Sequence, residues 1–366
     1  MLFTPEAHEV LADEPWNAER ARAAIVSIVA DTESAFDDGW STHPQDVVED
    51  DDASTRFRTV YCGGAGVVDG LHRLARRGFV ELRRDYVPYL EHSLEAPPDF
   101  PDEDPQRSFW GGETGIRLVL QRLAPSQANV ERLSELIAAN ERDERCELMW
   151  GSPGTILVGR ELGLDVSASV EWLHGRRDSD GLWTQQLSGH SRRFLGPAHG
   201  FAGCVLALGD VTDVSETLQR FAFEEDGLVN WPGLAGMELG ANRDGQIRMQ
   251  WCHGAPGIVA TLAHKLDEQL AVAGGELTWR AGPLRKGANL CHGTAGNGYA
   301  FLALLDRTGD ERWLTRARAF AMHAATQVER DRAEYRQGPY TLWTGDPGTA
   351  LYLADCVDGG GKLPLP

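Results

Sequence analysis

The chain has 366 residues, of which 42% are hydrophobic, so it is long enough to bury a sizeable core as one large domain or two ordinary ones. Its 55 acidic residues outnumber its 35 lysines and arginines, and the net charge of −20 excludes a general affinity for nucleic acid or anionic lipid. No run of about 18 apolar residues is present, which excludes a membrane-spanning helix.

The N-terminal residues, MLFTPEAHEVLADEPWN, lack the basic segment and apolar core of a secretory signal. The six cysteines would permit disulfides, but in a chain of this length without an export signal we expect thiols or metal ligands instead. The sequence therefore predicts a cytoplasmic protein.

Seven segments begin with Gly-x-x-Gly and continue with about ten residues rich in Leu, Ala, Val and Ile. In chain order they start 39 to 54 residues apart, at Gly63, Gly112, Gly151, Gly200, Gly254, Gly293 and Gly345. The third place of three segments holds Pro153, Pro256 or Pro347, which is typical of a first helical turn. Each motif therefore predicts the start of a short apolar helix.

A second helical stretch lies between successive motifs. Residues 133–147 and 311–331 carry apolar residues at helical spacing among abundant Ala, Arg and Glu, whereas strand signals are sparse. Each unit therefore predicts a helical hairpin, with a short apolar helix and a longer amphipathic one. The acidic run Glu49–Asp52 and the Pro-rich run Pro97–Pro105 are expected to be solvated loops.

Seven such hairpins cannot bury their apolar helices singly, so they must stack as an open solenoid or close into a ring. The glycine-led helices are apolar nearly all round, which indicates burial and favours closure. We therefore predict an all-α fold, with seven inner helices inside seven outer ones, formed by residues 1–366 as a single domain. All seven glycine starts would then lie at one end of the ring and border one pocket.

The residues just before the glycines carry the reactive side chains. His199, His253 and His292 directly precede three of the motif glycines, and Cys252 and Cys291 precede two of these histidines. Ring closure would gather two thiols and up to three imidazoles. Cys and His together favour Zn²⁺, and three protein ligands would leave a position open, as in catalytic sites. From the residues alone, a closed structural zinc site and two buried cysteines without metal remain alternatives.

The donor set also indicates a reaction. A metal held by two thiolates is a weaker choice for making hydroxide than one held by three imidazoles. It is well suited to binding a further thiol as a nucleophilic thiolate. The chemistry that the pattern favours is thiol alkylation, in which a sulfur attacks an electrophilic carbon.

The motifs WCHGAPG, LCHGTAGNGYAFL and PAHGFAG resemble those of the lanthionine synthetase C-like family, nearer to its eukaryotic-type LanC-like branch. The resemblance runs from Tyr61 to Leu353 and implies an α/α toroid, in agreement with the seven hairpins. It also implies that zinc is bound by Cys252, Cys291 and His292.

The same resemblance implies roles for residues outside the metal site. His199 would be the acid/base histidine, and Glu147 takes the place of an aspartate that precedes the third motif in the bacterial cyclases. Arg248 matches a basic position of those cyclases, and Lys286 resembles a lysine that helps to hold glutathione in eukaryotic-type members. His253 is expected to line the pocket.

The activity implied by the resemblance is zinc-dependent thioether formation. A cysteine or glutathione thiol would add to dehydroalanine or dehydrobutyrine in a peptide or protein. His199 would supply a proton to the α-carbon, and Arg248 would stabilise the enolate oxygen.

Two other functions compete with this one. A glycosidase or terpenoid cyclase on a similar ring would need paired carboxylates or acidic clusters, which the motifs do not present. A non-catalytic adaptor that binds zinc and glutathione would use the same residues as the enzyme, so the sequence does not separate the two.

Overall fold

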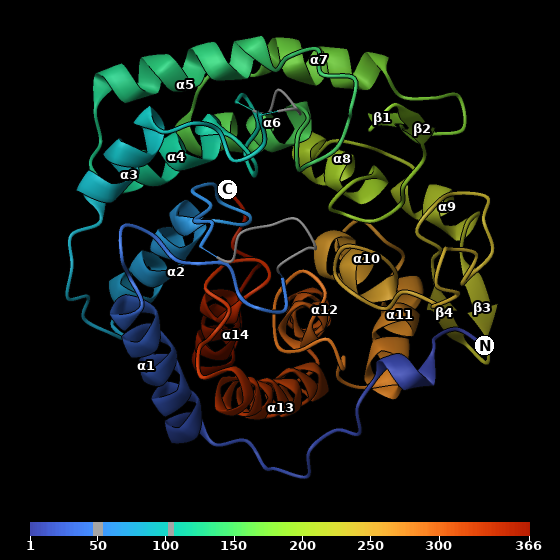
Figure 1. Cartoon of the computed structure of the whole chain (residues 1–366). Helices are drawn as coiled ribbons and strands as arrows, with labels where there is room; N and C mark the ends of the chain where they lie inside the picture. The colour runs from blue at the N-terminus through green and yellow to red at the C-terminus, as the bar shows by residue number, and fades with distance from the viewer. Residues whose placement is uncertain (47–53, 102–105) are drawn as a thin grey trace.

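The computed structural model describes residues 1–46, 54–101 and 106–366, which are mostly helical (Figure 1). Seven helices start directly after the first glycine of a motif: α2 Gly64–Arg76, α4 Glu113–Leu123, α6 Ser152–Leu162, α8 Phe201–Leu208, α10 Ala255–Leu262, α12 Thr294–Thr308 and α14 Asp346–Asp358. Seven more alternate with them along the chain: α1 Ala18–Ser34, α3 Val87–Glu95, α5 Gln127–Ala139, α7 Ser167–Gly175, α9 Val214–Gln219, α11 Glu268–Ala281 and α13 Arg312–Tyr335. The predicted all-α fold is confirmed.

The glycine-led helices form a closed inner ring. Each of them contacts the next one along the chain, and α14 returns to contact α2. The alternate helices lie outside this ring, where α1 packs against α14, α11 against α10, and α13 against α12 (Figure 1). The described residues therefore form the predicted double ring, an α/α toroid with seven inner and seven outer helices.

The second glycine of each motif lets the preceding turn pack against the first turn of its helix. A Cβ at Gly257 or Gly296 would overlap the carbonyl oxygen of Trp251 or Leu290, six residues earlier. The same relation holds in all seven motifs. A side chain at this position would push the preceding turn away from the helix, so the repeat of glycine follows from a repeated close contact.

Backbone hydrogen bonds join the turns that precede the inner helices. The Tyr61 N–H donates to the Trp110 carbonyl (3.0 Å). The Cys252 N–H donates to the Cys291 carbonyl (3.2 Å), and the Cys291 N–H donates to the Trp343 carbonyl (2.8 Å). A further bond joins the third and fourth motifs. The glycine starts therefore lie at one end of the ring, as the sequence predicts.

Three tryptophans from the second, fifth and seventh motifs pack together inside the ring. Trp110, Trp251 and Trp343 are fully buried, and their ring centroids lie 4.6 to 5.7 Å apart. Aromatic pairs at such distances stabilise a fold by about 0.5–1.5 kcal/mol each beyond the area that they bury. The cluster gives Cys252, which follows Trp251 directly, a rigid apolar neighbour.

The outer helices depart from the prediction in length. The helix expected over residues 311–331 is present as α13, but the one expected over residues 133–147 ends at Ala139. Its capping residue, Asn140, donates from its side-chain amide to the Trp150 carbonyl (3.3 Å), which turns the chain back toward α6. The prediction of longer outer helices is wrong for α3, α7 and α9, which are shorter than their inner neighbours α4, α6 and α8.

Two short β-hairpins occupy the connection between α7 and α8 and the connection between α9 and α10. Strands β1 Gln185–Leu187 and β2 His190–Arg192 pair antiparallel, as do β3 Phe223–Glu225 and β4 Leu228–Asn230. The segments that follow them are joined by an isolated bridge between Phe194 and Leu234. The hairpins thus fix a wall beside the start of α10.

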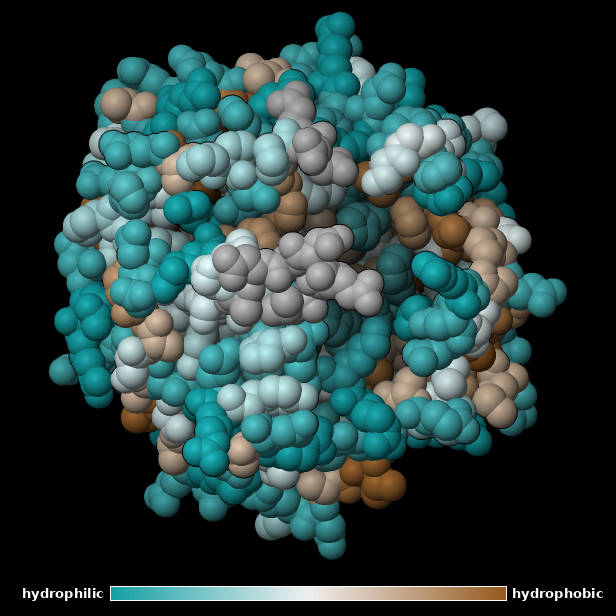
Figure 2. Space-filling model, viewed as in Figure 1, coloured by the Kyte–Doolittle hydropathy of each residue, from teal (hydrophilic) through white to brown (hydrophobic). Residues whose placement is uncertain are grey.

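No helix among the described residues is both long and apolar enough to cross a lipid bilayer. Figure 2 shows that the face seen in Figure 1 is mostly hydrophilic and is hollowed just to the right of its centre. A hydrophilic face is in line with the large net charge of the chain.

The two expected loops have different outcomes. The acidic run Glu49–Asp52 lies outside the described residues. The described part of the Pro97–Pro105 run is irregular, as expected of a loop. It is not fully solvated, however, because the Asp99 carboxylate accepts hydrogen bonds from the N–H groups of Arg58 (2.9 Å) and Thr59 (2.8 Å). This segment therefore packs against the turn before α2.

Candidate functional site

Two cysteine thiols from separate motifs lie in contact at the glycine end of the inner ring. Cys252 is in the turn before α10 and Cys291 in the turn before α12, and both are buried. Their thiols are hydrogen-bonded to each other, and a backbone hydrogen bond links the same two residues. The fold thus brings together the two sulfurs that the sequence singles out.

Each sulfur also accepts a hydrogen bond from a second residue. The Gln250 side-chain amide donates to the Cys252 sulfur (2.8 Å), and the Tyr61 hydroxyl donates to the Cys291 sulfur (2.9 Å). The sequence analysis did not identify either donor. A signal existed for Tyr61, because it stands two residues before its motif glycine, the same place that both cysteines occupy.

The thiol pair holds a negative charge readily. The hydrogen bond with Cys291 lowers the pKa of Cys252 to about 7 against the opposing effect of burial, and Gln250, His199 and Lys286 add to the lowering. The same hydrogen bond and burial raise the pKa of Cys291. Near neutral pH the pair therefore favours one thiolate that is stabilised by the neighbouring thiol.

His292 follows Cys291 directly and is half-buried. Burial and the positive charge of Lys286 lower the pKa of the imidazole to about 4, so it is neutral at physiological pH. A neutral imidazole is the form that binds metals. Among the described residues, no three His, Cys, Asp or Glu side chains are arranged so that they could hold an ion. The donor types nevertheless fit the chemistry of Zn²⁺, because two buried thiols and the neutral imidazole of the residue that follows one of them are groups that this ion prefers.

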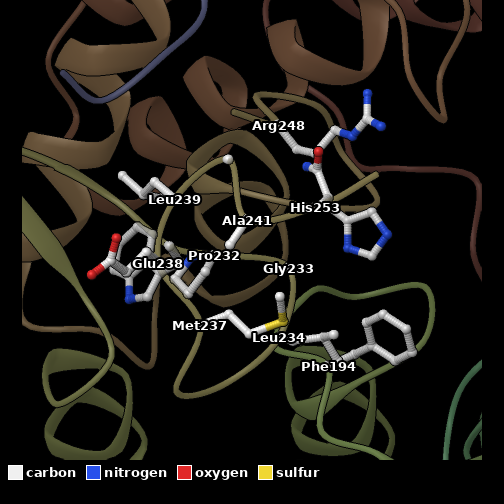
Figure 3. A pocket seen from close by; sticks show the side chains of 13 residues that line it. Phe194, Pro232, Gly233, Leu234, Met237, Glu238, Leu239, Ala241, Arg248 and His253 are labelled. Atoms are coloured by element: carbon white, nitrogen blue, oxygen red, sulfur yellow. The ribbon is translucent and has the colours of Figure 1, made fainter. Parts of the chain in front are cut away.

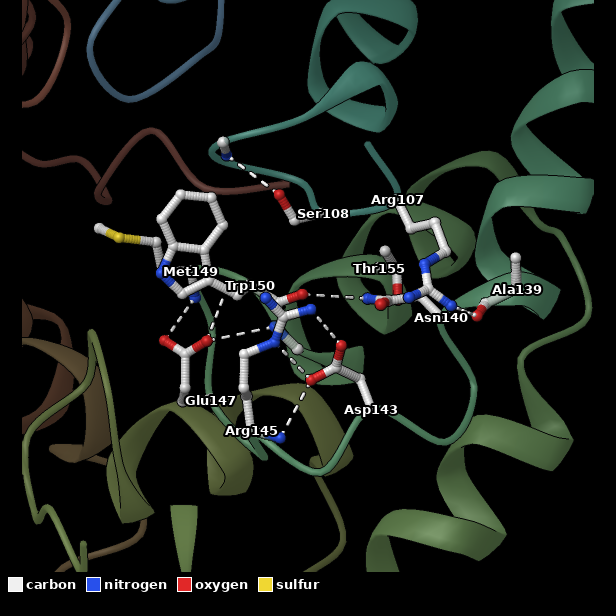
Figure 4. Close-up of polar contacts among 12 residues, drawn as sticks. Arg107, Ser108, Ala139, Asn140, Asp143, Arg145, Glu147, Met149, Trp150 and Thr155 are labelled. Carbon is white, nitrogen blue, oxygen red and sulfur yellow. Dashed lines mark hydrogen bonds and ion pairs between the residues drawn. The ribbon is translucent and has the colours of Figure 1, made fainter. Parts of the chain in front are cut away.

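His199 and Glu147 form a pair at the turns before α8 and α6. The His199 Nδ1 lies 2.9 Å from the Glu147 carboxylate, and Glu147 is fully buried. That carboxylate also accepts hydrogen bonds from the N–H groups of Met149 (2.9 Å), Trp150 (2.6 Å) and Gly151 (3.2 Å) (Figure 4). Glu147 is therefore held in one orientation and in turn fixes the ring of His199.

The environment keeps His199 protonated more readily than an ordinary histidine. Burial lowers the pKa of His199, but the hydrogen bond and the charge of Glu147 outweigh it, and the Cys252 thiolate adds to the effect, so the pKa is raised. The site therefore contains a proton donor within electrostatic reach of the thiol pair.

Arg248 and Lys286, the two cations that the sequence singles out, border the same cavity. This cavity of about 190 Å³ is also lined by Glu6, His8 and Gln250. Arg248 forms an ion pair with Asp244 (2.6 Å) and so does not point freely at the thiols. The charge of exposed Lys286, by contrast, lowers the pKa of both Cys252 and His292.

His253 lines a second cavity, of about 240 Å³, which Arg248 also borders (Figure 3). Its walls are mainly apolar and include Phe194, Leu234 and Met237. The Phe194 ring lies 5.7 Å from the His253 ring and 6.0 Å from the His199 ring, so the cavity opens next to the His199–Glu147 pair. Burial and the nearby positive charges lower the pKa of His253 to about 4, which makes it a neutral lining group.

Comparisons with known proteins give matches in sequence and in structure. The sequence model of the lanthionine synthetase C-like protein family matches residues 58–363. Over 181 aligned residues the chain is 31% identical to glutathione S-transferase LANCL1 of Danio rerio, and this alignment covers 46% of this chain and 44% of that protein. Over 189 aligned residues it is 34% identical to LanC-like protein GCL1 of Arabidopsis thaliana, and this alignment covers 46% of this chain and 42% of that protein. The chain thus matches less than half the length of these two curated relatives.

A solved structure shares the fold. Nisin cyclase superposes with a TM-score of 0.53 over 83% of this chain and 94% of its own, at 16% sequence identity. The family match covers all seven motifs, and both curated relatives are eukaryotic, as the resemblance of the motifs leads us to expect. The chain therefore belongs to the lanthionine synthetase C-like protein family.

Proposed function

We propose that this protein forms thioethers by adding a thiol to dehydroalanine or dehydrobutyrine in a peptide or protein. The observation that carries the proposal is the contact between the Cys252 and Cys291 thiols, which come from helix starts 39 residues apart. His199, which Glu147 keeps charged, interacts electrostatically with Cys252 and would supply the proton. A thiol-binding centre next to a proton donor is what such an addition needs.

We propose that Cys252, Cys291 and His292 would hold a Zn²⁺ ion. The support is their chemistry, because two buried sulfurs in contact and a neutral imidazole are donors that zinc prefers. When bound, the ion would keep an incoming thiol deprotonated and nucleophilic at neutral pH.

The remaining steps fall to the side chains of the chain. The thiolate sulfur bonds to the β-carbon of the dehydroamino acid, and the electrons of the double bond move to the carbonyl oxygen as an enolate. His199, kept charged by Glu147, gives its proton to the α-carbon and leaves a saturated thioether. We assign Arg248 to stabilise the developing charge on the oxygen, for which it must leave Asp244.

The two cavities suggest how the substrates divide. The cavity that holds Lys286, Arg248 and Glu6 carries both signs of charge, which suits a small thiol with carboxylates and an ammonium group, such as glutathione. The apolar cavity beside His253 and Phe194 suits the peptide that carries the dehydroamino acid. We propose glutathione or a peptide cysteine as the thiol donor.

We also propose a cytoplasmic location. All six cysteines are free, and Cys252 and Cys291 are in contact as reduced thiols. A reducing compartment would keep them in that state, which the proposed chemistry requires.

The test is to incubate the purified chain, loaded with Zn²⁺, with glutathione and a dehydroalanine peptide, and to follow the adduct by mass spectrometry. We expect adduct formation above the uncatalysed rate. Glutathione binding without any rate above background would instead identify a non-catalytic zinc- and glutathione-binding adaptor, the alternative that the same ligands permit.

A further inference from the structure

Each of the two paired sulfurs has its own hydrogen-bond donor, and the two donors come from different parts of the chain. Gln250 stands two residues before Cys252, whereas Tyr61 is 230 residues away from Cys291. We propose that Gln250 and Tyr61 are positioning residues that set the charge and orientation of the two sulfurs toward a bound metal. This inference rests on the metal centre of the proposed function.

The Gln250 amide is fixed in place by its own backbone. Its N–H donates to the His253 carbonyl (2.9 Å), and the His253 N–H donates back to the Gln250 carbonyl (3.0 Å). The turn so formed encloses Cys252, and the Gln250 side chain is buried. The amide therefore reaches the Cys252 sulfur without having to be ordered by a ligand.

Tyr61 is held just as firmly by the second motif. Its ring packs at 5.5 Å from the Trp110 ring, and its N–H donates to the Trp110 carbonyl (3.0 Å). Trp110 in turn packs on Trp251, the residue before Cys252. The Tyr61 hydroxyl thus links the turn of the first motif to the Cys291 sulfur in the turn of the sixth motif.

A donor that faces a sulfur has a chemical consequence. A hydrogen bond to a thiolate draws negative charge from the sulfur and fixes the direction of its lone pairs. The partners that orient metal ligands typically account for 10- to 100-fold in metal affinity. Two such donors would limit the charge that accumulates when two thiolates share one ion, and they would hold the sulfurs in one arrangement.

The variants Tyr61→Phe and Gln250→Met test each donor separately with little change in volume. Tyr299→Phe is a matched control, because the buried Tyr299 hydroxyl donates to Asp355 (2.6 Å) and not to a thiol. Gln327→Met controls for the loss of a buried amide, which there donates to the Leu284 carbonyl (2.8 Å).

The proteins are loaded with Co²⁺, whose sulfur-to-metal charge-transfer band reports the charge on the thiolates, and zinc affinity is measured by competition with a chelator. We expect this band to move to lower energy in Tyr61→Phe and Gln250→Met, and zinc affinity to fall by about tenfold. Neither change should occur in Tyr299→Phe or Gln327→Met.

An unchanged band and affinity in both site variants, with Co²⁺ fully bound, would overturn the inference and leave the proposed function intact. If the unsubstituted protein shows no sulfur-to-metal band at all, the metal centre itself is refuted, and the inference falls with it. Should one variant not fold, the other still decides, since each donor serves a different sulfur.

Discussion

The buried carboxylate of Glu147 serves both the fold and the candidate site. It accepts three backbone hydrogen bonds at the start of α6, so it is satisfied and fixed before any substrate binds. It also pairs with His199 and raises the pKa of that histidine. The extra methylene relative to an aspartate is therefore accommodated, because Glu147 both caps its own turn and reaches the His199 ring.

We expect His199→Ala to retain zinc but to lower the rate of thiol addition by about 100- to 10,000-fold, the usual contribution of a general acid. The rate and the metal content of the variant check this. An undiminished rate would remove His199 from the mechanism.

We expect Glu147→Gln to lower the pKa of His199, because the substitution removes the charge that stabilises the imidazolium. His199 acts as an acid, so activity is lost as pH rises through its pKa. The alkaline limb of the pH–rate profile should therefore move to lower pH. Glu131→Gln, on the exposed face of α5, is the control and should leave the profile in place.

The same pair makes stability depend on pH. The folded-state pKa of His199 is raised above its usual value of 6.5, so the pair stabilises the fold fully below that value. The contribution is lost as pH rises through the raised pKa. In urea denaturation, Glu147→Gln should therefore destabilise the protein more at pH 6 than at pH 9, and an equal loss at both would contradict the assignment.

We expect Cys291→Ala to abolish stoichiometric zinc binding and thioether formation, because it removes one of the two paired sulfurs. Metal analysis of the purified variant provides the measurement. Cys356→Ala removes a buried thiol from α14 and should bind zinc normally. Unchanged metal content in Cys291→Ala would refute the ligand assignment.

At the scale of the element, each inner helix is one copy of a repeated device. The first glycine caps the helix, and the second lets the preceding turn lie against it. This arrangement presents the two residues before the glycine at the end of the ring. Tyr61, Cys252 and Cys291 occupy the same place in three copies, so the site arises from side-chain changes on a constant backbone.

The variant Gly296→Ala tests this device. Its methyl group would overlap the Leu290 carbonyl at the start of α12, so we expect the free energy of unfolding to fall by about 1–3 kcal/mol. Gly175→Ala, in α7, meets no atom within 4 Å and should not destabilise the protein. Urea denaturation of both variants gives the comparison, and equal stability would refute the close-contact argument.

At the scale of the whole molecule, the N-terminal helix covers the last inner helix of the closed ring. The helix α1 packs against α14, so the N-terminal part of the chain seals the last inner helix. The continuous contacts from α2 round to α14 support our proposal that residues 1–366 form a single domain.

We expect Ile25→Ala to lower the free energy of unfolding by about 2–5 kcal/mol, because Ile25 is fully buried in α1. The neighbouring Val26 is 51% exposed, and Val26→Ala should change stability by less than about 0.5 kcal/mol. If the chain is a single domain, thermal unfolding of Ile25→Ala stays a single transition at a lower temperature. Two separate transitions would contradict the single domain.

The sequence by itself determined the number of helical pairs, the closure of the ring and which two of the six cysteines belong to the candidate site. It could do so because glycine spacing and apolar periodicity are local features that recur in every repeat. The limits of the outer helices could not be predicted, since contacts such as that of Asn140 with Trp150 override local helix propensity. Only the tertiary structure decided which groups face the thiols. Tyr61 meets Cys291, and Glu147 meets His199, because a closed ring sets residues side by side that are 230 and 52 positions apart, and no local pattern encodes that distance.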